Sequence, residues 1–249
     1  MIDTHVHVGH WAKTTEKTTV AEVFCQRLNA GLTQIICMPT DLEKNYRMKD
    51  RVQFFNGPEG KELLFGYWIN PHRDLAIVLE EIEFLKPVML KYHPSHSQKR
   101  VNAPDLESFW HSIDILELPL LVHCGRWQEM ASYNFVFDLV DQFPTLNVIA
   151  AHWGGVSTEL KMAFSKRLNQ ECWPNLFLET SSIITGPITQ GVTVEEFKEL
   201  MQLVPTTQML FGSDYPFFSM TESAKFLREN LHPGSIYQIE INEKRVFKR

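Results

Sequence analysis

Five apolar segments of this chain end on a side chain that can bind a metal ion or move a proton. In sequence order, these side chains are His5 and His7 after MIDTHVH, Lys91 after VMLK, His123 after LLVH, His152 after VIAAH, and Asp214 after MLFGSD. Imidazole nitrogens and carboxylate oxygens are common protein ligands of divalent transition metals. The ordered set therefore predicts an active site in which a metal ion activates water for hydrolysis.

The His-x-His pair is the first part of the predicted metal site. His5 and His7 lie two residues apart, and residues two apart in a strand point to the same side. Such a pair can arise by chance, but His123 and Asp214 end two further apolar segments. We therefore predict His5, His7, His123 and Asp214 as ligands of one divalent metal, Zn²⁺ first, with Mn²⁺ or Fe²⁺ as alternatives.

The elements that must position these residues alternate along the chain. Strands are predicted at 1–7, 33–39, 63–70, 87–92, 119–123, 147–152, 175–181 and 208–214. Helices are predicted at 19–30, 72–85, 104–117, 131–143, 156–170, 193–203 and 220–230. Several predicted strands are continuously apolar, which is typical of parallel strands buried on both faces.

The repeat length of these elements predicts the fold. Successive strand ends lie roughly 22 to 33 residues apart, which suits a repeated βα unit. Eight such units fill 249 residues as a (β/α)₈ TIM barrel, for which ~250 residues is typical. A doubly wound sheet is the competing fold, but its G-x-G-x-x-G turn does not occur. We predict one barrel domain over 1–249, with the strand-end residues gathered on its catalytic face.

Composition narrows the class of protein. The 44% hydrophobic content suits a large core, and the net charge of −6 disfavours nucleic acid and anionic membranes as partners. No apolar run approaches the ~18 residues that span a bilayer, and no signal-like segment precedes His5. The four cysteines form no C-x-x-C pair. We expect a cytoplasmic protein with a small-molecule substrate, and the 12% aromatic content suits either a core or a homo-oligomer interface.

Taken together, these motifs resemble the amidohydrolase superfamily, most closely its amidohydrolase-2 branch of metal-dependent hydrolases and non-oxidative decarboxylases. The matching segments are DTHVH (3–7), LKYHP (90–94), VHCG (122–125), AHWGG (151–155), GSDYPF (212–217) and INEKRVF (241–247). The resemblance implies a metal at the strand ends, with Asp214 as ligand or general base. It also implies that His152 hydrogen-bonds the attacking water or polarises the substrate, with a role as fifth ligand as the alternative.

Lys91 separates two kinds of relative. In binuclear relatives the strand-four lysine is carboxylated and bridges two metals, whereas in the branch resembled here it is generally unmodified. We therefore expect an unmodified Lys91 that binds a substrate carboxylate or a developing oxyanion. The alternative is a lysine that extends over the barrel rim into solvent.

Residues beside the motifs are expected to complete the site. His93 and Trp153 are predicted to contact the substrate. Arg126 is predicted to bind a planar carboxylate through two parallel hydrogen bonds, unless it pairs with Glu129 on an exposed loop. Asp3 is expected to orient a ligand imidazole. Glu179 either points inward or simply ends its strand, so the predicted site does not include it.

The leading functional prediction is a metal-dependent hydrolase that cleaves a small carboxylate-bearing amide, ester or lactone, with Asp214 as general base for the activated water. The alternative is a non-oxidative decarboxylase of the same branch, many of which carry a Glu near the first motif where this chain has Asp3. Phosphodiesterases and deoxyribonucleases of the superfamily tend to have a Glu in the place of Lys91. A non-catalytic barrel would lack the proton-transfer residues, yet Asp214 and His152 are both present.

Overall fold

The computed structural model describes residues 1–11, 17–40, 44–56, 60–125, 127–170, 172–186 and 189–248. Its strands form a single sheet in the order β2-β1-β3-β4-β5-β6-β7-β8-β9. The strands are β1 (Ile2–His10), β2 (Lys17–Thr18), β3 (Gln34–Pro39), β4 (Leu63–Trp68), β5 (Met89–Tyr92), β6 (Leu120–Val122), β7 (Val148–Ala150), β8 (Leu176–Glu179) and β9 (Met209–Leu210). Neighbouring strands are parallel, except that β2 pairs antiparallel with the end of β1.

The segment after β9 closes the sheet into a barrel. Val6 and Tyr215 form a parallel bridge. The backbone N–H of Thr4 donates to the carbonyl of Phe211 at 3.0 Å, and that of Asp214 donates to the carbonyl of His5 at 2.7 Å. These bonds seat the last strand segment against β1 and leave Asp214 beside His5. The predicted TIM barrel is confirmed.

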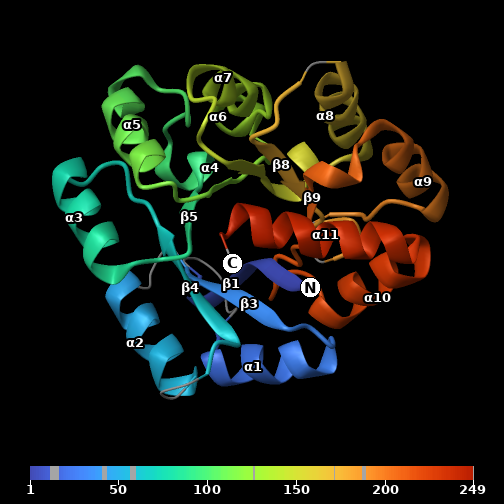
Figure 1. The fold of residues 1–249 in the computed structure, drawn as a ribbon, viewed down its shortest axis with the longest axis horizontal. Helices are drawn as coiled ribbons and strands as arrows, with labels where there is room; N and C mark the ends of the chain where they lie inside the picture. The colour runs from blue at the N-terminus through green and yellow to red at the C-terminus, as the bar shows by residue number, and fades with distance from the viewer. Residues whose placement is uncertain are drawn as a thin grey trace.

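Helices surround the barrel on its outer side (Figure 1). They are α1 (Val20–Asn29), α2 (Asn45–Asn56), α3 (Leu75–Leu85), α5 (Glu107–Ile115), α7 (Asn134–Gln142), α8 (Thr158–Gln170), α9 (Val194–Leu203) and α10 (Met220–Asn230). Two short helices, α4 (Pro94–Ser97) and α6 (Gln128–Ala131), and three 3₁₀ turns, η1 (Pro104–Leu106), η2 (Ala151–Gly154) and η3 (Thr206–Gln208), lie in connections. Among the described residues, no helix is both long and apolar enough to cross a bilayer.

Local sequence signals explain where several helices begin. Thr19 and Glu22 form a capping box at α1, and Thr193 and Glu196 form one at α9. Each pair satisfies backbone N–H groups that the first helical turn leaves without an intrahelical partner. The helices predicted at 19–30 and 193–203 thus begin next to these capping threonines.

The structure differs from the predicted elements in several places; helix α11 (Pro233–Val246), for example, is not among the predicted helices. Helix α2 is not predicted, because its polar sequence buries only Met48 and Val52 and so carries little apolar periodicity. Strand β9 is shorter than the predicted 208–214, since the residues after it pair with β1 only through isolated backbone bonds. The predicted helix at 104–117 divides into η1 and α5.

An apolar layer fills one end of the barrel interior. Its strand residues are Ile2, Ile36, Met38, Met89, Leu121, Ile149, Phe177 and Leu210. Helix α11 (Pro233–Val246) crosses this end and adds Val246 and Phe247 to the layer (Figure 1). The helix is attached to β1, because Glu243 Oε1 accepts a hydrogen bond from the Ile2 N–H at 2.8 Å. The opposite end of the interior carries the polar strand-end residues.

Candidate active site

Three predicted metal ligands meet at the carboxyl ends of the strands. The Nε2 atoms of His5 and His7 lie 3.1 Å apart, and Asp214 Oδ1 lies 3.3 and 3.4 Å from them. Lys91 Nζ lies 2.9 Å from His5 Nε2. All four side chains are buried. Side chains from β1, β5 and the segment after β9 thus share one small space, and the ligand atoms of the two histidines and Asp214 lie within 4.8 Å of one another.

Burial controls the charge of these groups. It lowers the pKa of the His5 and His7 imidazoles well below its usual range, with a further contribution from the nearby Lys91 charge. Burial also lowers the pKa of Lys91 to about 8, although the negative charges of Asp214 and Glu179 oppose this shift. It raises the pKa of Asp214 well above its usual range. The two imidazoles are therefore neutral, which is the state in which a histidine binds a metal.

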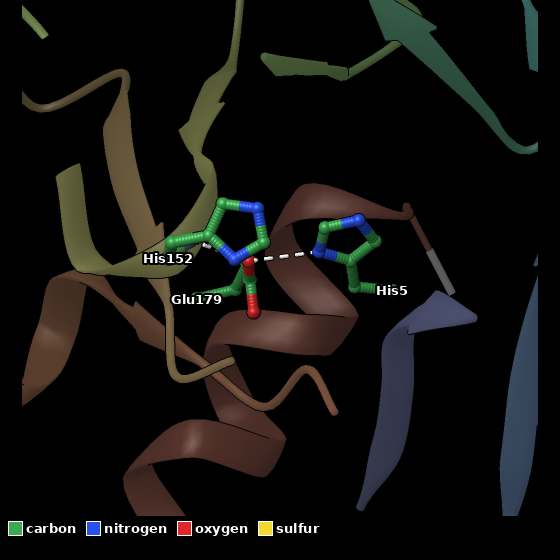
Figure 2. A group of neighbouring side chains, drawn as sticks. All are labelled: His5, His152 and Glu179. Atoms are coloured by element: carbon green, nitrogen blue, oxygen red, sulfur yellow. Dashed lines mark hydrogen bonds and ion pairs between the residues drawn. The ribbon is translucent and has the colours of Figure 1, made fainter. Parts of the chain in front are cut away.

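Glu179 is the residue that sequence reasoning left out and the structure places in the centre (Figure 2). Its Oε1 lies 3.0 Å from His5 Nδ1 and accepts hydrogen bonds from the His152 N–H at 2.8 Å and the Ser181 hydroxyl at 2.6 Å. Its Oε2 accepts the Ser181 N–H at 2.7 Å. Strict alternation from the inward-facing Phe177 was the signal that pointed to it.

His152 lies beside Asp214 but does not end a strand, as the predicted strand at 147–152 required. Strand β7 ends at Ala150, and His152 adopts a left-handed backbone conformation with φ of 57°. This conformation is uncommon for non-glycine residues and concentrates at functional sites. His152 Nδ1 lies 4.0 Å from Asp214 Oδ2 and 2.7 Å from Ser181 Oγ.

His123 departs from the predicted ligand set. Its Nδ1 lies 2.9 Å from His152 Nε2, and its ring stacks on His93 with centroids 3.8 Å apart. A Cβ at Gly125 would lie 2.2 Å from His123 Nε2, so the glycine makes room for this ring position. Among the described residues, the groups that could hold an ion are His5, His7 and Asp214, and His5, His152 and Glu179. The structure thus brings together three of the four predicted ligands and turns His123 toward His152 instead.

The residues predicted to bind substrate lie in different surroundings. Lys91 points into the site and is fully buried, which excludes the alternative of a rim lysine in solvent. His93 is buried between His123 and Trp68, whose ring stacks on it at 5.7 Å. Trp153 corrects the prediction, because its buried indole donates to Ser165 Oγ on α8 at 2.8 Å and so packs in the helical layer behind the site. Arg126 lies outside the described residues.

Asp3 acts on the backbone rather than on a ring. Its Oδ1 accepts hydrogen bonds from the N–H groups of His5 at 3.1 Å and Ser213 at 3.0 Å. These bonds fix β1 against the segment that carries Asp214. Burial raises the pKa of Asp3 to about 7. Asp3 was expected to orient a ligand imidazole, and its hydrogen bonds instead hold the main chain of His5 and Ser213.

Trp68 connects the buried cluster to an open cavity. The ring of Trp68 lies 5.6 Å from that of His7 and 5.9 Å from that of His96. Trp68 and His96 line a cavity of about 700 Å³, together with Thr40, Lys44, Asn45, Tyr46, Ile69, Asn70, Pro71, His72, Arg73, Glu81, Phe84, Leu85 and Ser97. This volume would accept a small organic molecule. Trp68 belongs to none of the strand-end motifs, so the sequence pattern does not select it.

The donor set fits a divalent metal ion. His5, His7 and Asp214 offer two neutral nitrogens and a carboxylate oxygen on converging side chains. Such a mixed nitrogen and oxygen set is typical of catalytic zinc and of related divalent metals. A cation would also offset the cost of burying the Asp214 and Glu179 carboxylates, whose negative charges repel each other.

Solved structures of similar fold cover the chain from end to end. One is 5-carboxyvanillate decarboxylase from Sphingomonas paucimobilis, with 14% identity, a TM-score of 0.72, and coverage of 99% of this chain and 98% of that one. A second is a probable 2-pyrone-4,6-dicarboxylic acid hydrolase from Acinetobacter baumannii, solved with citric acid, with 15% identity, a TM-score of 0.72, and coverage of 100% and 99%.

A third is a dihydroxybenzoic acid decarboxylase from a Polaromonas species, solved with manganese and 2-nitroresorcinol. It has 12% identity, a TM-score of 0.67, and coverage of 99% of this chain and 96% of that one. No curated protein matches the chain in sequence. A family model described as Amidohydrolase matches residues 58–232, which is more than half of the chain and spans Lys91, His123, His152 and Asp214. This protein therefore belongs to the amidohydrolase family, in its amidohydrolase-2 branch.

Proposed function

We propose that this enzyme is a metal-dependent hydrolase that cleaves a small carboxylate-bearing amide, ester or lactone. The observation that carries the proposal is the position of Asp214. Its carboxylate lies 3.3 and 3.4 Å from the Nε2 atoms of His5 and His7, and 4.0 Å from His152 Nδ1. A carboxylate between the donor nitrogens and a further imidazole is placed to take a proton from attacking water and to pass it on.

The same residues would hold the metal. His5, His7 and Asp214 would bind one divalent ion, Zn²⁺ first, with Mn²⁺ or Fe²⁺ as alternatives. When bound, such an ion supplies Lewis acidity and lowers the pKa of water. The manganese in the Polaromonas decarboxylase supports a divalent metal for this site.

Lys91 and the aromatic wall would bind the substrate. With a pKa of about 8, the buried ammonium of Lys91 is largely protonated at neutral pH. It therefore presents a positive charge to a substrate carboxylate or to oxygen charge that develops in the transition state. The rings of His93 and Trp68 stack beside this position and would exclude water from a planar substrate. We propose a small molecule as the substrate, with no nucleic acid or membrane taking part.

The alternative is a non-oxidative decarboxylase, and two of the similar structures carry that activity in their names. The first strand favours hydrolysis. Its carboxylate, Asp3, is engaged by the N–H groups of His5 and Ser213 and so lies behind the site. Strand β1 therefore offers two imidazoles and no carboxylate ligand.

An isotope experiment separates the two reactions. Purified enzyme is incubated in H₂¹⁸O with a panel of carboxylate-bearing lactones, esters and amides and, in parallel, with hydroxylated aromatic acids. Hydrolysis incorporates one ¹⁸O into the product for each bond cleaved, without release of carbon dioxide. Release of carbon dioxide with a solvent proton left on carbon would instead establish the decarboxylase.

Metal dependence is tested on the same substrates. We expect about one divalent ion per chain by elemental analysis, and activity that falls with a chelator and returns with added metal. Full activity after chelation, in protein that contains no metal, would contradict the metal-dependent mechanism.

A further inference from the structure

We propose that Glu179 is a positioning residue that sets the tautomers of His5, His152 and His123 through one directed chain of hydrogen bonds. The chain runs from His123 through His152 and Ser181 to the Glu179 carboxylate, where His5 joins it. The inference deepens the proposed function and rests on it, because His5 and His152 belong to the proposed site. It concerns proton positions, however, and does not depend on which reaction the enzyme performs.

The direction of the chain starts at Glu179. Each of its oxygens accepts a hydrogen bond from a backbone N–H, Oε1 from His152 at 2.8 Å and Oε2 from Ser181 at 2.7 Å. A backbone N–H can only donate, so both oxygens act as acceptors, as in an ionised carboxylate. Lys91 Nζ lies 2.9 Å from His5 Nε2 and, as an ammonium, can only donate, so Nε2 is the acceptor there. His5 Nδ1, 3.0 Å from Glu179 Oε1, is then the donor in that contact. A neutral imidazole has one donor and one acceptor nitrogen, so the His5 lone pair is on Nε2.

The hydroxyl of Ser181 determines which ring nitrogen of His152 donates. This hydroxyl has one proton, which it donates to Glu179 Oε1 at 2.6 Å. At its 2.7 Å contact with His152 Nδ1, the Ser181 oxygen must therefore accept. This places the His152 proton on Nδ1 and its lone pair on Nε2. A longer contact of 3.5 Å between Ser181 Oγ and His5 Nδ1 agrees with the same direction, since the His5 proton can be shared between two acceptors.

The tautomer of His152 in turn determines the tautomer of His123. His152 Nε2 lies 2.9 Å from His123 Nδ1, and because this Nε2 has the lone pair, His123 Nδ1 must donate. The His123 lone pair is then on Nε2. One carboxylate thus makes all three imidazoles Nδ1–H tautomers. For His5, the lone pair on Nε2 faces Lys91, His7 and Asp214, where a metal would be held.

The surrounding backbone is built to hold this carboxylate. A Cβ at Gly212 would lie 2.1 Å from Glu179 Oε2, so the glycine before Ser213 leaves the space that the carboxylate fills. Next to this series of hydrogen bonds, the fully buried Lys161 on α8 donates to the Gly155 carbonyl at 2.6 Å and to Ser182 Oγ at 3.1 Å. Lys161 therefore connects the two loops that carry His152 and Ser181. Metal-binding histidines generally need such a fixed partner on their second nitrogen.

The test is ¹⁵N NMR of the metal-free, histidine-labelled full chain, because the two ring nitrogens of a neutral histidine have distinct shifts in each tautomer. In the wild type we expect His5, His123 and His152 as Nδ1–H tautomers. In Ser181→Ala, His5 should keep its tautomer, while His152 and His123 become mixtures. In Glu179→Met, which removes the acceptor at similar length, His5 should become a mixture as well. The exposed Glu199→Gln is the matched control and should change none of them.

A second readout is the affinity for Zn²⁺ alone, measured by competition with a chromogenic chelator. Glu179→Met should weaken binding about 10- to 100-fold, Ser181→Ala should weaken it much less, and Glu199→Gln should leave it unchanged. An Nε2–H tautomer of His5 in the wild type would overturn the proposal. An unchanged tautomer pattern in a folded Ser181→Ala would also overturn it, and this small substitution keeps the test valid if Glu179→Met does not fold. A decarboxylase outcome in the isotope experiment would leave this inference untouched.

Discussion

The two ends of the barrel interior are built by the same strands and differ almost completely in chemistry. At the end covered by α11, the inward-facing residues are apolar, as with Met89, Leu121 and Phe177. Two residues further along the same strands, the inward-facing side chains are Lys91, His123 and Glu179. Because side chains alternate with a period of two, the next inward-facing residue along each of these strands lies in the active site and no longer in the apolar core.

The difference indicates that the apolar end contributes mainly to the stability of the fold, whereas the polar end carries the reactive groups. The apolar layer gains free energy from the burial and close packing of hydrocarbon side chains. At the polar end, burial raises the pKa of Asp214 and Glu179 and lowers that of Lys91, which shows that the charged forms are costly there. We expect substitutions at the polar end to affect turnover more than folding, and substitutions at the apolar end to do the reverse.

The largest effect is expected from Asp214→Asn at the polar end. The amide cannot accept a proton, so kcat/KM should fall about 10²- to 10⁴-fold, while the melting temperature stays the same or rises because a buried carboxylate is removed. Steady-state kinetics and thermal unfolding measure the two. Asp105→Asn, which removes an exposed carboxylate, is the control. Wild-type turnover in Asp214→Asn would show that Asp214 takes no part in proton transfer.

Phe177→Ala at the apolar end should do the opposite. Phe177 is fully buried, and its truncation should lower the free energy of unfolding by about 3–5 kcal/mol through lost burial and a residual cavity. Phe84→Ala is the matched control, because Phe84 is 84% exposed and its loss should change stability by less than about 0.5 kcal/mol. Denaturant titration gives both values. Equal losses in the two variants would mean that the apolar layer does not stabilise the fold.

Lys161→Met tests how the buried Lys161 amine, next to the polar end, affects the pH dependence of stability. Burial lowers the pKa of Lys161 to about 7, whereas an unfolded lysine titrates near ~10.4. Between these values the unfolded chain binds a proton that the folded chain does not, so this residue makes stability rise with pH. The wild type should therefore gain about 2 kcal/mol relative to Lys161→Met between pH 7 and pH 9.

Unfolding titrations at the two pH values measure that gain. The exposed Lys198→Met should show the same pH dependence as the wild type. If the difference between wild type and Lys161→Met does not change with pH, the Lys161 amine is not titrating in this range.

The smallest effect is expected from Ile149→Val, which removes one methylene group from the apolar layer. Stability should fall by about 0.5–1.5 kcal/mol, seen as a lower denaturant midpoint with an unchanged slope. Turnover at saturating substrate should remain that of the wild type. A tenfold loss of turnover would show that the two ends are coupled, because Ile149 lies two residues before Ala151 at the start of η2.

Much of the fold follows from local patterns in the sequence. Continuous apolar runs, the spacing of their ends, and the capping residues at α1 and α9 are short-range signals, so the alternation of strands and helices was predictable. Helix α2 was missed for the same reason, because its sequence has few apolar positions and the helix forms against the barrel. The closure of β9 against β1 depends on pairing across more than 200 residues, which no local pattern contains.

The sequence by itself determined which residues stand at the strand ends, because apolar runs and period-two alternation are properties of the chain. It therefore predicted His5, His7, Lys91, His152 and Asp214 as site residues, and the structure brings their side chains together. Only the tertiary structure decided which way the side chains beyond those ends point. His152, Trp153 and Asp214 all have φ between 55° and 59°, a conformation that alternation cannot predict. Tertiary contacts then turned His123 toward His152, buried Trp153 behind the site, and placed Glu179 where it can hydrogen-bond His5, a proposed metal ligand.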